Sequence, residues 1–428
     1  MSVFRIGTNK SSVNNFPSIR PTLDLNFANT KTLDPRITFT RASGGSYVGA
    51  DGLIKYAGVN EARFDHDPET GESLGLLIEE SRSNLLSWSE NFNNWGIYSG
   101  VNPATITRKE SNIKSPDGIS NYFVCTYGAT DLRQSFLGGG GKTYTASCFY
   151  KQPSNGDISD LAAFEIHIIG GSTSIGQITY SFSQNKIIRS TGNVPVTTGF
   201  QKYSDNSVRL WITITDDGDG TGVFFLNLRG GNTPSNVGKS ILTWGAQIEE
   251  GSFPTSYIPT QASTRTRAAD FAYIKNIDKT DWFNKDEGTL IFQHTKIPVS
   301  ANQPLKYPAF GFARTQNGNS TNTIQYFLTR VGEGFYLVRN INNIFELSIG
   351  VSQTESTVGF NYKTNEFSIS RNGLLMRQIF SGVLPLNFYM LVIGFNSINS
   401  NEQINAHCKY LRYYPKSLPN LQLQQLTR

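Results

Sequence analysis

Along most of this chain, hydrophobic and polar residues alternate with the period of two that is typical of half-buried β-strands. The clearest example begins at Thr243, where Trp244, Ala246 and Ile248 are expected on one face of a strand and the intervening residues on the other. Gly251 ends this predicted strand. The same pattern recurs on both sides of it, so the chain is expected to fold mainly as sheets.

The segment from Phe253 to Thr260 interrupts the alternation. Pro254 and Pro259 fix the backbone φ angle and remove two hydrogen-bond donors, which excludes the middle of a sheet or a helix. The segment also contains three large apolar side chains, those of Phe253, Tyr257 and Ile258. Large apolar side chains of this kind are not expected in a free linker. We therefore predict an extended, ordered connector that docks on a sandwich.

The alternating stretches fall into three groups. Residues 22–86 show short predicted strands with tight turns, such as the hairpin signal Asp51-Gly52. The strands predicted in the second group are 144–150, 164–169, 177–183, 208–215, 223–229 and the one that contains Trp244. The strands predicted in the third group are 288–297, 323–330, 335–340, 345–350, 356–362, 366–379 and 390–395, followed by a short helix at Leu421 to Leu426.

These groups define the expected domains. The predicted segments are 1–86 (an arm and a short-stranded region), 87–260 (a first sandwich), 261–275 (a linker) and 276–428 (a second sandwich). Each sandwich has enough strands to fold independently, so a chain that starts near residue 87 is expected to stay folded. The strands of residues 22–86 either form their own unit or lie against the later domains. Residues 1 to about 20 are a flexible or partner-held arm.

Composition supports the same fold class. The 428 residues are enough for two or three domains with buried cores. Charged residues make up 17% of the chain and aromatic residues 12%, and 40 residues are glycine. This mixture is poor in helix formers and rich in strand and turn formers. We predict an all-β protein with two antiparallel β-sandwiches, and the aromatic content excludes intrinsic disorder.

Charge and cysteine content exclude several classes of protein. The net charge of +5 includes no basic run, which argues against binding to nucleic acid. No apolar run approaches the ~20 residues of a membrane span, and the first ten residues lack the apolar core of a signal peptide. Cys125, Cys148 and Cys408 are too scattered for a disulfide framework or a metal knuckle. Synthesis in a reducing cytosol is expected.

The only dense carboxylate cluster is the candidate metal site. It consists of Asp216, Asp217 and Asp219 in the sequence DDGDG. Carboxylate oxygens are the ligands that calcium prefers, so these three residues are calcium candidates. The alternative is a polar hairpin loop, since Asp and Gly are turn formers. The spacing does not match an EF-hand, which requires Glu at its twelfth position, and no other cofactor is predicted.

No catalytic constellation is visible. The adjacent carboxylate pairs are Glu79-Glu80, Glu249-Glu250 and Asp286-Glu287. Neighbours in a strand point to opposite faces, whereas a glycosidase needs two carboxylates that face one cleft. The four histidines, at 66, 167, 294 and 407, match no metal-binding pattern, and His167 is interpreted as a structural residue of a strand. We predict no catalytic residue and no enzyme activity.

Aromatic residues are the remaining candidates, because exposed rings serve as stacking platforms for sugars. The candidates are Trp88, Trp95, Trp211, Trp282, Tyr413 and Tyr414. Large aromatic residues also dominate the cores of β-sandwiches. A core position is therefore favoured for each of them.

Three stretches resemble one family of proteins. Thr243 to Asp270 contains WGAQIEEGSFPTSYIPT and TRAAD. Leu33 to Asp67 and Gly71 to Leu86 contain LDPRITFTRAS, DGLIKYAGVNEARFDHD and GESLGLLIEESRSNLL. Both stretches, and the C-terminal YLRYYPKSLPNLQLQQLTR, resemble virion proteins of tailed bacteriophages of the tail-fibre, head-fibre and spike type. The first sandwich resembles a carbohydrate-binding-module jelly roll. The second resembles a concanavalin A-like lectin.

The resemblance implies a function. It implies a non-enzymatic fibre or spike of the virion that attaches to host surface glycans through lectin-like modules. The alternatives are a purely structural capsid decoration, head fibre or adaptor, and a polysaccharide depolymerase. The implied partners are other virion proteins and host surface polysaccharide, with assembly in the host cytoplasm and release by lysis.

Two further expectations concern the oligomeric state of the protein and its orientation on the particle. Several copies of a weak site multiply its effective affinity, so a homo-oligomer is expected, and the resemblance to phage fibres implies a trimer. Residues 1–86 are expected to anchor the protein to the particle. The two sandwiches are then expected to project outward.

Overall fold

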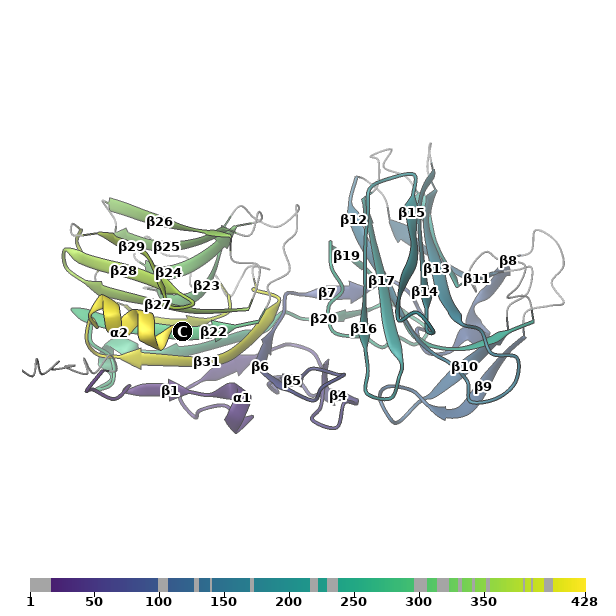
Figure 1. Ribbon diagram of the computed structural model, residues 1–428, viewed down its shortest axis with the longest axis horizontal. Coiled ribbons are helices and arrows are strands. Elements are labelled where there is room, and N and C mark those ends of the chain that lie inside the picture. The colour runs from purple at the N-terminus through teal and green to yellow at the C-terminus, as the bar shows by residue number, and fades with distance from the viewer. Residues whose placement is uncertain are drawn as a thin grey trace, which may run out of the picture.

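The computed structural model shows two β-sandwiches side by side (Figure 1). It describes residues 17–98, 107–126, 131–138, 141–169, 173–215, 222–228, 238–295, 306–313, 323–329, 333–340, 343–351, 355–379, 382–385, 388–395 and 403–428. The paired strands are antiparallel throughout the sheets. The predicted fold class, all-β with two antiparallel sandwiches, is confirmed.

The first sandwich consists of two six-stranded sheets. One sheet has the order β16 (Val196–Lys202), β17 (Val208–Thr215), β12 (Thr143–Lys151), β19 (Ser240–Glu250), β10 (Asn121–Thr126) and β9 (Thr107–Lys114). The other has the order β15 (Lys186–Gly192), β14 (Thr173–Ser181), β13 (Leu161–Ile169), β18 (Gly222–Leu228), β11 (Asp131–Gly138) and β8 (Gly96–Tyr98). Alternate residues of facing strands, such as Ala146, Phe164 and Ile212, fill one core between the sheets.

The second sandwich consists of an eight-stranded and a seven-stranded sheet. The first has the order β29 (Leu374–Ile379), β28 (Glu366–Arg371), β27 (Ser356–Lys363), β22 (Glu287–His294), β31 (Ala406–Tyr414), β6 (Ser73–Ile78) and β5 (Phe64–His66), with β1 (Leu23–Leu25) also paired to β31. The second has the order β2 (Thr38–Thr40), β21 (Phe271–Lys275), β30 (Met390–Ile393), β23 (Lys306–Ala313), β24 (Thr323–Thr329), β25 (Glu333–Asn340) and β26 (Asn343–Val351). The predicted closing helix is confirmed as α2 (Asn420–Leu426), which packs on this sandwich.

Residues 22–86 contribute strands to the second sandwich. Strands β1, β5 and β6 belong to its eight-stranded sheet and β2 to its seven-stranded sheet. Their side chains, such as Leu25, Phe39 and Leu76, lie in the same core as Leu290 and Phe312. This is the second of the two arrangements that the sequence left open. A chain that starts at residue 87 would lack these four strands, which conflicts with the expectation that it stays folded.

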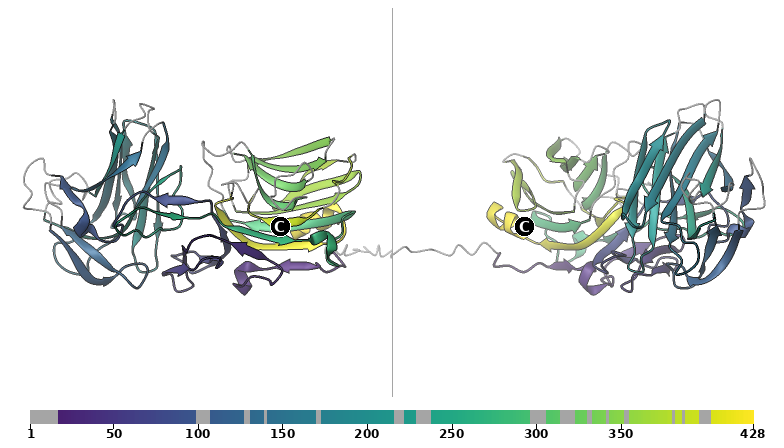
Figure 2. Two further views of the ribbon diagram at one scale, coloured as in Figure 1. Left: turned by 180° about the vertical axis from the view of Figure 1, so that it is seen from behind. Right: turned by 45° about the vertical axis from the view of Figure 1, so that its right-hand side comes forward.

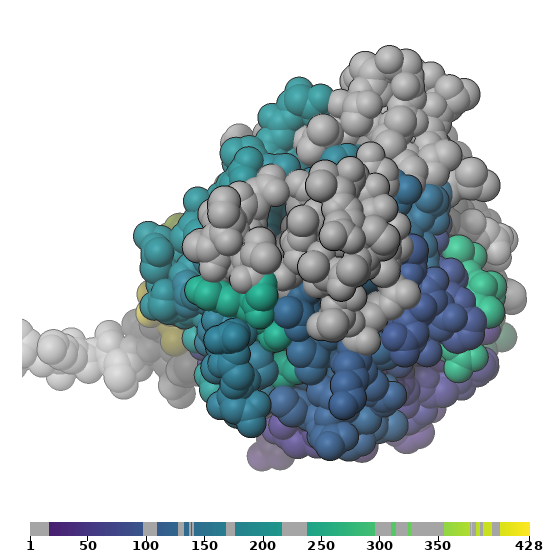
Figure 3. All heavy atoms as spheres, turned by 90° about the vertical axis from the view of Figure 1, so that its right-hand side faces the viewer, coloured from purple at the N-terminus to yellow at the C-terminus, as the bar shows by residue number. Residues whose placement is uncertain are grey.

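Part of the remaining N-terminal region lies between the sandwiches. Strands β3 (Gly45–Val48) and β4 (Ile54–Ala57) form a hairpin there, and the short helix α1 (Phe27–Thr30) contacts β6 and β31. Strand β7 (Arg82–Asn84) pairs with β20 (Arg265–Arg267), which follows the connector. Figure 2 shows from behind that the purple N-terminal segment runs beneath the second sandwich and reaches the space between the two, and the space-filling view shows the first sandwich from its outer side (Figure 3). No helix of the described residues has the length and apolar character needed to cross a bilayer.

The strand β19 departs from the predicted pattern at Gly245. Gly245 has φ +64°, and the register between β12 and β19 shifts beside it, which is a β-bulge. The bulge places Trp244 on the outer face of the sheet, whereas Ala246 and Ile248 face the core. The prediction that these three residues share a face is therefore wrong. A bulge inverts the side-chain alternation of a strand, which the period-two pattern does not reveal.

The predicted connector is confirmed as an ordered, docked segment. Phe253, Tyr257 and Ile258 are buried, and the Tyr257 ring lies 4.6 Å from that of Trp244, between centroids. Backbone groups of the connector are also held, since Gln247 accepts from Ile258 N–H at 2.7 Å. The bulge therefore has a structural role, because it turns Trp244 outward to receive the connector.

Candidate functional site

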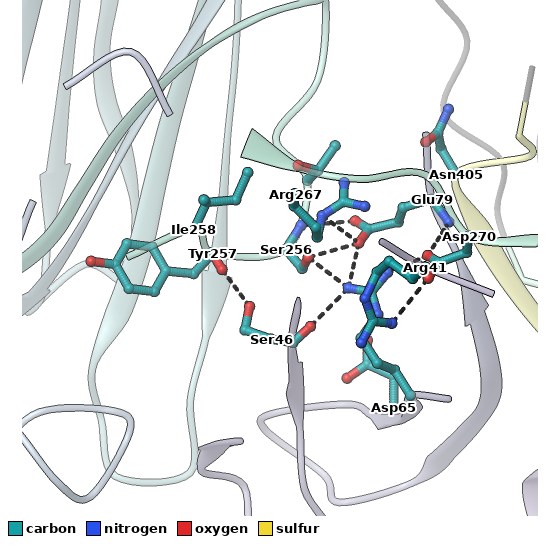
Figure 4. A network of polar contacts seen from close by, with 12 residues as sticks. Arg41, Ser46, Asp65, Glu79, Ser256, Tyr257, Ile258, Arg267, Asp270 and Asn405 are labelled. Atoms are coloured by element: carbon teal, nitrogen blue, oxygen red, sulfur yellow. Dashed lines mark hydrogen bonds and ion pairs between the residues drawn. The ribbon is translucent and has the colours of Figure 1, made fainter. Parts of the chain in front are cut away.

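A buried network of charges lies at the junction of the two sandwiches (Figure 4). The Arg41 Nη1 atom lies 3.1 Å from Asp270 Oδ1, and Arg63 Nη1 lies 2.7 Å from Glu79 Oε2. Arg63 also contacts Asp270 through Nη2, and Arg267 Nε lies 3.5 Å from Glu79 Oε2. All five side chains are at most 6% exposed. Removing one partner of such a pair leaves an uncompensated buried charge.

Hydrogen bonds from the connector and from the β3–β4 hairpin complete the network. Glu79 Oε1 accepts from the backbone N–H of Ser256 at 2.8 Å, and Glu79 Oε2 accepts from its hydroxyl at 2.7 Å. Arg63 donates to the carbonyl of Ser46 at 2.9 Å. Arg41 donates to the carbonyl of Gly58 at 2.7 Å. The network therefore fixes the N-terminal region, the connector and the start of the second sandwich relative to one another.

Glu79 is ionised despite its burial. Burial by itself would raise the pKa of Glu79, but Arg267, Arg63 and the hydrogen bonds from Ser256 outweigh it, so the pKa lies below its usual value. Burial lowers the pKa of Arg267, which shares Glu79 with Arg63. Three guanidinium groups thus face two carboxylates, those of Glu79 and Asp270.

Two of the stretches that carry the family resemblance supply this network. Arg41 belongs to LDPRITFTRAS, Arg63 to NEARFDHD and Glu79 to GLLIEE. Arg267 and Asp270 belong to TRAAD. These two stretches therefore supply all five charged side chains of the network at the junction.

A cavity of about 780 Å³, which we call the junction pocket, opens beside the network. Three segments line it: the β3–β4 hairpin with Tyr56, the first sandwich at Glu90 and Asp117, and the chain from Tyr257 to Arg267. Tyr56 is 41% exposed. The volume lies within the range of pockets that hold small organic ligands, roughly 300–1,000 Å³.

The polar wall of the junction pocket is a pair of carboxylates that share one hydroxyl. The Ser120 Oγ atom lies 3.3 Å from Glu90 Oε2 and 2.9 Å from Asp117 Oδ2. Glu90 also accepts from the hydroxyl of Tyr257 at 3.1 Å. Burial raises the pKa of Glu90, and burial together with the charges of Glu90 and Asp117 raises that of Tyr56. This wall accepts hydrogen bonds, which suits a ligand that carries hydroxyl groups.

The rim of the junction pocket is apolar. Val59 is 61% exposed and Ile119 is 69% exposed, and both line the pocket. Together with the Tyr56 ring they form an exposed apolar surface at the seam between the sandwiches. Exposed apolar residues at the rim of a pocket are candidates for contact with a ligand or another protein.

The predicted calcium candidates Asp216, Asp217 and Asp219 lie outside the described residues. Within the described residues, no group of three or more His, Cys, Asp or Glu side chains is placed to hold a metal ion. The three cysteines are buried.

The adjacent carboxylate pairs do not face a common cleft. Glu79 is held by arginines, Glu80 by Arg82 and Glu249 by Thr255, whereas the partners of Glu250, Asp286 and Glu287 are the lysines Lys142, Lys285 and Lys416. His167 contacts Glu165 within β13, as a structural residue does. His66 and His407, which are remote in sequence, line one cavity. That proximity was not visible in the sequence.

Of the aromatic candidates, Trp95, Tyr413 and Tyr414 are buried. Trp88 and Trp282 are partly buried and pack against the cores. Trp211 is also partly buried and lies on the outer face of β17. Sequence reasoning missed Tyr56, Glu90 and Asp117, because no spacing or motif connects residues that only the junction brings together.

No protein-family model and no curated protein sequence matches this chain. Solved structures share a likeness with about a third of it. The carbohydrate-binding module CBM40 of the Ruminococcus gnavus IT-sialidase, bound to α2,3-sialyllactose, is 12% identical, with a TM-score of 0.29 over 34% of this chain and 84% of that one. The NanB sialidase of Streptococcus pneumoniae is 14% identical, with a TM-score of 0.29 over 36% of this chain and 26% of that one.

A third structure of this kind is domain 4 of the arabinanase AbnA of Geobacillus stearothermophilus, in complex with arabinotriose. It is 10% identical, with a TM-score of 0.29 over 41% of this chain and 82% of that one.

Proposed function

We propose that this protein is a fibre or spike protein of a tailed-bacteriophage virion that attaches the particle to host surface glycans. One observation carries the proposal. The separate stretches that resemble phage virion proteins converge on one buried charge network, which lies at the junction of the two β-sandwiches and contributes Arg267 to the lining of a pocket. A junction of this kind holds a ligand-binding surface rigid, which suits a protein that must work outside a cell.

The junction pocket is the glycan site of this proposal. The exposed ring of Tyr56 offers an apolar face to a sugar ring, while Glu90 and Asp117 accept hydrogen bonds from its hydroxyls. A single pocket of this type binds weakly. Assembly as a homotrimer, part of the same proposal, multiplies the effective affinity for a repetitive surface polysaccharide.

The test is binding of the purified full-length chain to surface polysaccharide prepared from the host. Tyr56→Ala is expected to weaken binding at least tenfold, because the stacking face is lost, while Leu374→Ala, at an exposed position far from the pocket, leaves it unchanged. Light scattering should give a mass three times 47.4 kDa. Absence of binding by the unmodified protein contradicts the glycan role, and a stable monomer contradicts the trimer.

The apolar rim favours a second candidate function, a purely structural adaptor or decoration protein of the particle. Val59 and Ile119 would then contact another virion protein. In this case Ile119→Asp reduces incorporation into particles, and the unmodified protein binds no host polysaccharide. Cryo-electron microscopy of the virion, which locates the protein on the head or the tail, distinguishes the two roles.

The proposal includes no catalysis. Glu90 and Asp117 nevertheless place two carboxylates in one pocket, as a glycosidase requires. If the protein releases reducing sugar from host polysaccharide and Glu90→Gln abolishes this release, the protein is a depolymerase and the attachment role is wrong.

A further inference from the structure

Among the described residues, the two carboxylates in the wall of the junction pocket have no cationic partner. Glu90 and Asp117 both line the pocket, and both lie within 3.3 Å of the Ser120 Oγ atom. The acidic residues of the neighbouring charge network, Glu79 and Asp270, are in contrast paired with arginines. The pocket wall therefore carries negative charge that the part of the chain described by the structure does not compensate.

The hydrogen bonds on this wall favour Asp117 over Glu90. Ser120 has one hydroxyl proton, and its Oγ atom lies 2.9 Å from Asp117 but 3.3 Å from Glu90. Asp117 also accepts from the backbone N–H groups of Ile119 and Ser120, both at 2.9 Å. Glu90 accepts from the Tyr257 hydroxyl at 3.1 Å. Glu90 is therefore the carboxylate that has most to gain from a donor on a ligand.

The environment of Glu90 favours a positively charged donor. Glu90 is half-buried, burial raises its pKa, and the charge of Asp117 raises the pKa further. The hydrogen bonds from Tyr257 and Ser120 offset this effect only in part. An opposite charge beside such a carboxylate stabilises its ionised form, and a hydrogen bond between charged groups is about twice as strong as one between neutral groups. An ammonium group therefore gains more here than a neutral hydroxyl.

Tyr56 places an aromatic ring beside the same wall. Burial and then the charges of Glu90 and Asp117 raise the pKa of the Tyr56 hydroxyl, so the three side chains are close to one another. Tyr56 is 41% exposed and lines the pocket, so its ring is accessible to a ligand. An aromatic face packs against a sugar ring and also attracts a cation.

The basic residues near the pocket do not neutralise this wall. Arg267 contacts Glu79 of the charge network. Lys114 of β9 donates to the backbone carbonyl of Ile119 at 2.8 Å. Arg265 lines the pocket but is exposed to solvent, which screens its charge.

We infer that the junction pocket selects a sugar with a free amino group, whose ammonium lies against Glu90 while its ring lies against Tyr56. An acidic sugar is disfavoured, because its carboxylate would meet the charges of Glu90 and Asp117. An N-acetylated sugar is disfavoured because acetylation removes the positive charge. The inference rests on the proposed glycan-binding function and names the class of sugar that the pocket binds.

The experiment uses the full-length chain and four probes with related rings: glucosamine, glucose, N-acetylglucosamine and glucuronic acid. Binding is measured by isothermal titration calorimetry at about pH 7, where an amine of this kind is mostly protonated. Glucosamine is expected to bind about tenfold more tightly than glucose or N-acetylglucosamine, and glucuronate more weakly than glucose. Added salt is expected to weaken the binding of glucosamine and leave that of glucose unchanged.

The variant Glu90→Gln keeps the shape of the side chain and removes its charge. It is expected to lower the affinity for glucosamine to that for glucose. Asp286→Asn is the matched control, because Asp286 is an exposed carboxylate of the second sandwich that pairs with Lys285 and is absent from the pocket lining. It is expected to leave the binding of all four probes unchanged. Thermal unfolding checks that both variants are folded.

Host surface polysaccharide provides a second readout. Chemical N-acetylation of its free amino groups is expected to lower its affinity for the protein about tenfold. Unchanged affinity after N-acetylation overturns the inference and leaves the proposed function standing. Equal binding of glucosamine and glucose, both lost in Tyr56→Ala, has the same meaning, as does tighter binding of glucuronate than of glucosamine.

The remaining outcomes also decide between the two ideas. If Glu90→Gln fails to fold, the salt dependence of glucosamine binding to the unmodified chain decides the result. An affinity for glucosamine that does not change with salt overturns the inference. If the unmodified chain binds neither a sugar nor host polysaccharide, the inference and the proposed function both fail.

Discussion

The chain assembles its two sandwiches in different ways. Every strand of the first lies in one continuous stretch, from Gly96 to Glu250. The second combines strands from residues 23–78 with strands from residues 271–414. The two parts of the second sandwich are therefore separated by the whole of the first. The comparison shows that the second sandwich needs the N-terminal residues at the seam in order to fold. The first sandwich is only attached there.

Removal of residues 1–86 is the test of this comparison with the largest expected effect. The truncated chain loses β1, β2, β5 and β6 together with Arg41, Arg63 and Glu79, so the second sandwich is expected not to fold. Residues 85–260 expressed alone are expected to fold, because they contain the whole core of the first sandwich. Circular dichroism and thermal unfolding of both fragments provide the measurement. A cooperative transition from the second sandwich without residues 1–86 would refute the account.

Substitution of Arg63 tests the seam itself. Arg63→Ala leaves Glu79 and Asp270 buried with one partner fewer, and the expected loss in the free energy of unfolding is about 3–5 kcal/mol. Arg36→Ala is the control, because its ion pair with Asp34 is on the surface and contributes at most about 1 kcal/mol. Equal losses for the two variants, in urea unfolding, would show that the network does not hold the seam.

His294 gives the second sandwich a pH dependence of its own. The residue is fully buried, and burial lowers its pKa from 6.5 to about 4. Below pH 6.5 the unfolded chain binds a proton that the folded chain does not. The free energy of unfolding therefore falls by up to about 3 kcal/mol as the pH is lowered from 6.5 to 4. His294→Phe is expected to flatten this slope. An unchanged slope would mean that another group causes it.

Gly245 makes a smaller contribution, confined to the first sandwich. Gly245→Ala forces a side chain into φ +64° and places its Cβ 2.9 Å from the Phe149 ring. The expected loss in the free energy of unfolding is about 1–3 kcal/mol. Gly156→Ala is the matched control, since its φ is +88° and no atom lies within 4 Å of the new Cβ. The difference between the losses of the two variants measures the contribution of packing at the bulge. Equal losses would show that this packing makes no contribution.

The sequence predicted the parts of the fold that local pattern determines. Strand periodicity indicated both sandwiches, and the prolines of the connector indicated an ordered segment between β19 and β20. The pattern did not reveal the bulge at Gly245, because a glycine at that position is also compatible with an ordinary strand. It also left open which sheets residues 22–86 would join, since pairing between β1 and β31 spans nearly the whole chain.

Less of the candidate site than of the fold could be predicted from the sequence. Arg63 and Asp270 are 207 positions apart, and neither alone indicates an ion pair. Tyr56, Glu90 and Asp117 belong to three segments with no shared motif. The aspartates that composition emphasised, Asp216 to Asp219, drew attention because they are adjacent, whereas the junction pocket is assembled only by tertiary contacts.

Hydrogen–deuterium exchange of the full-length chain, with and without host surface polysaccharide, tests the central claim most directly. The account predicts slower exchange on binding in the segments that line the junction pocket, residues 56–59, 117–120 and 257–267. Strands remote from the seam, such as β28 and β29, should exchange at an unchanged rate. Protection confined to those remote strands, or no protection anywhere at saturating polysaccharide, would contradict the proposal that the seam between the sandwiches is the glycan-binding surface.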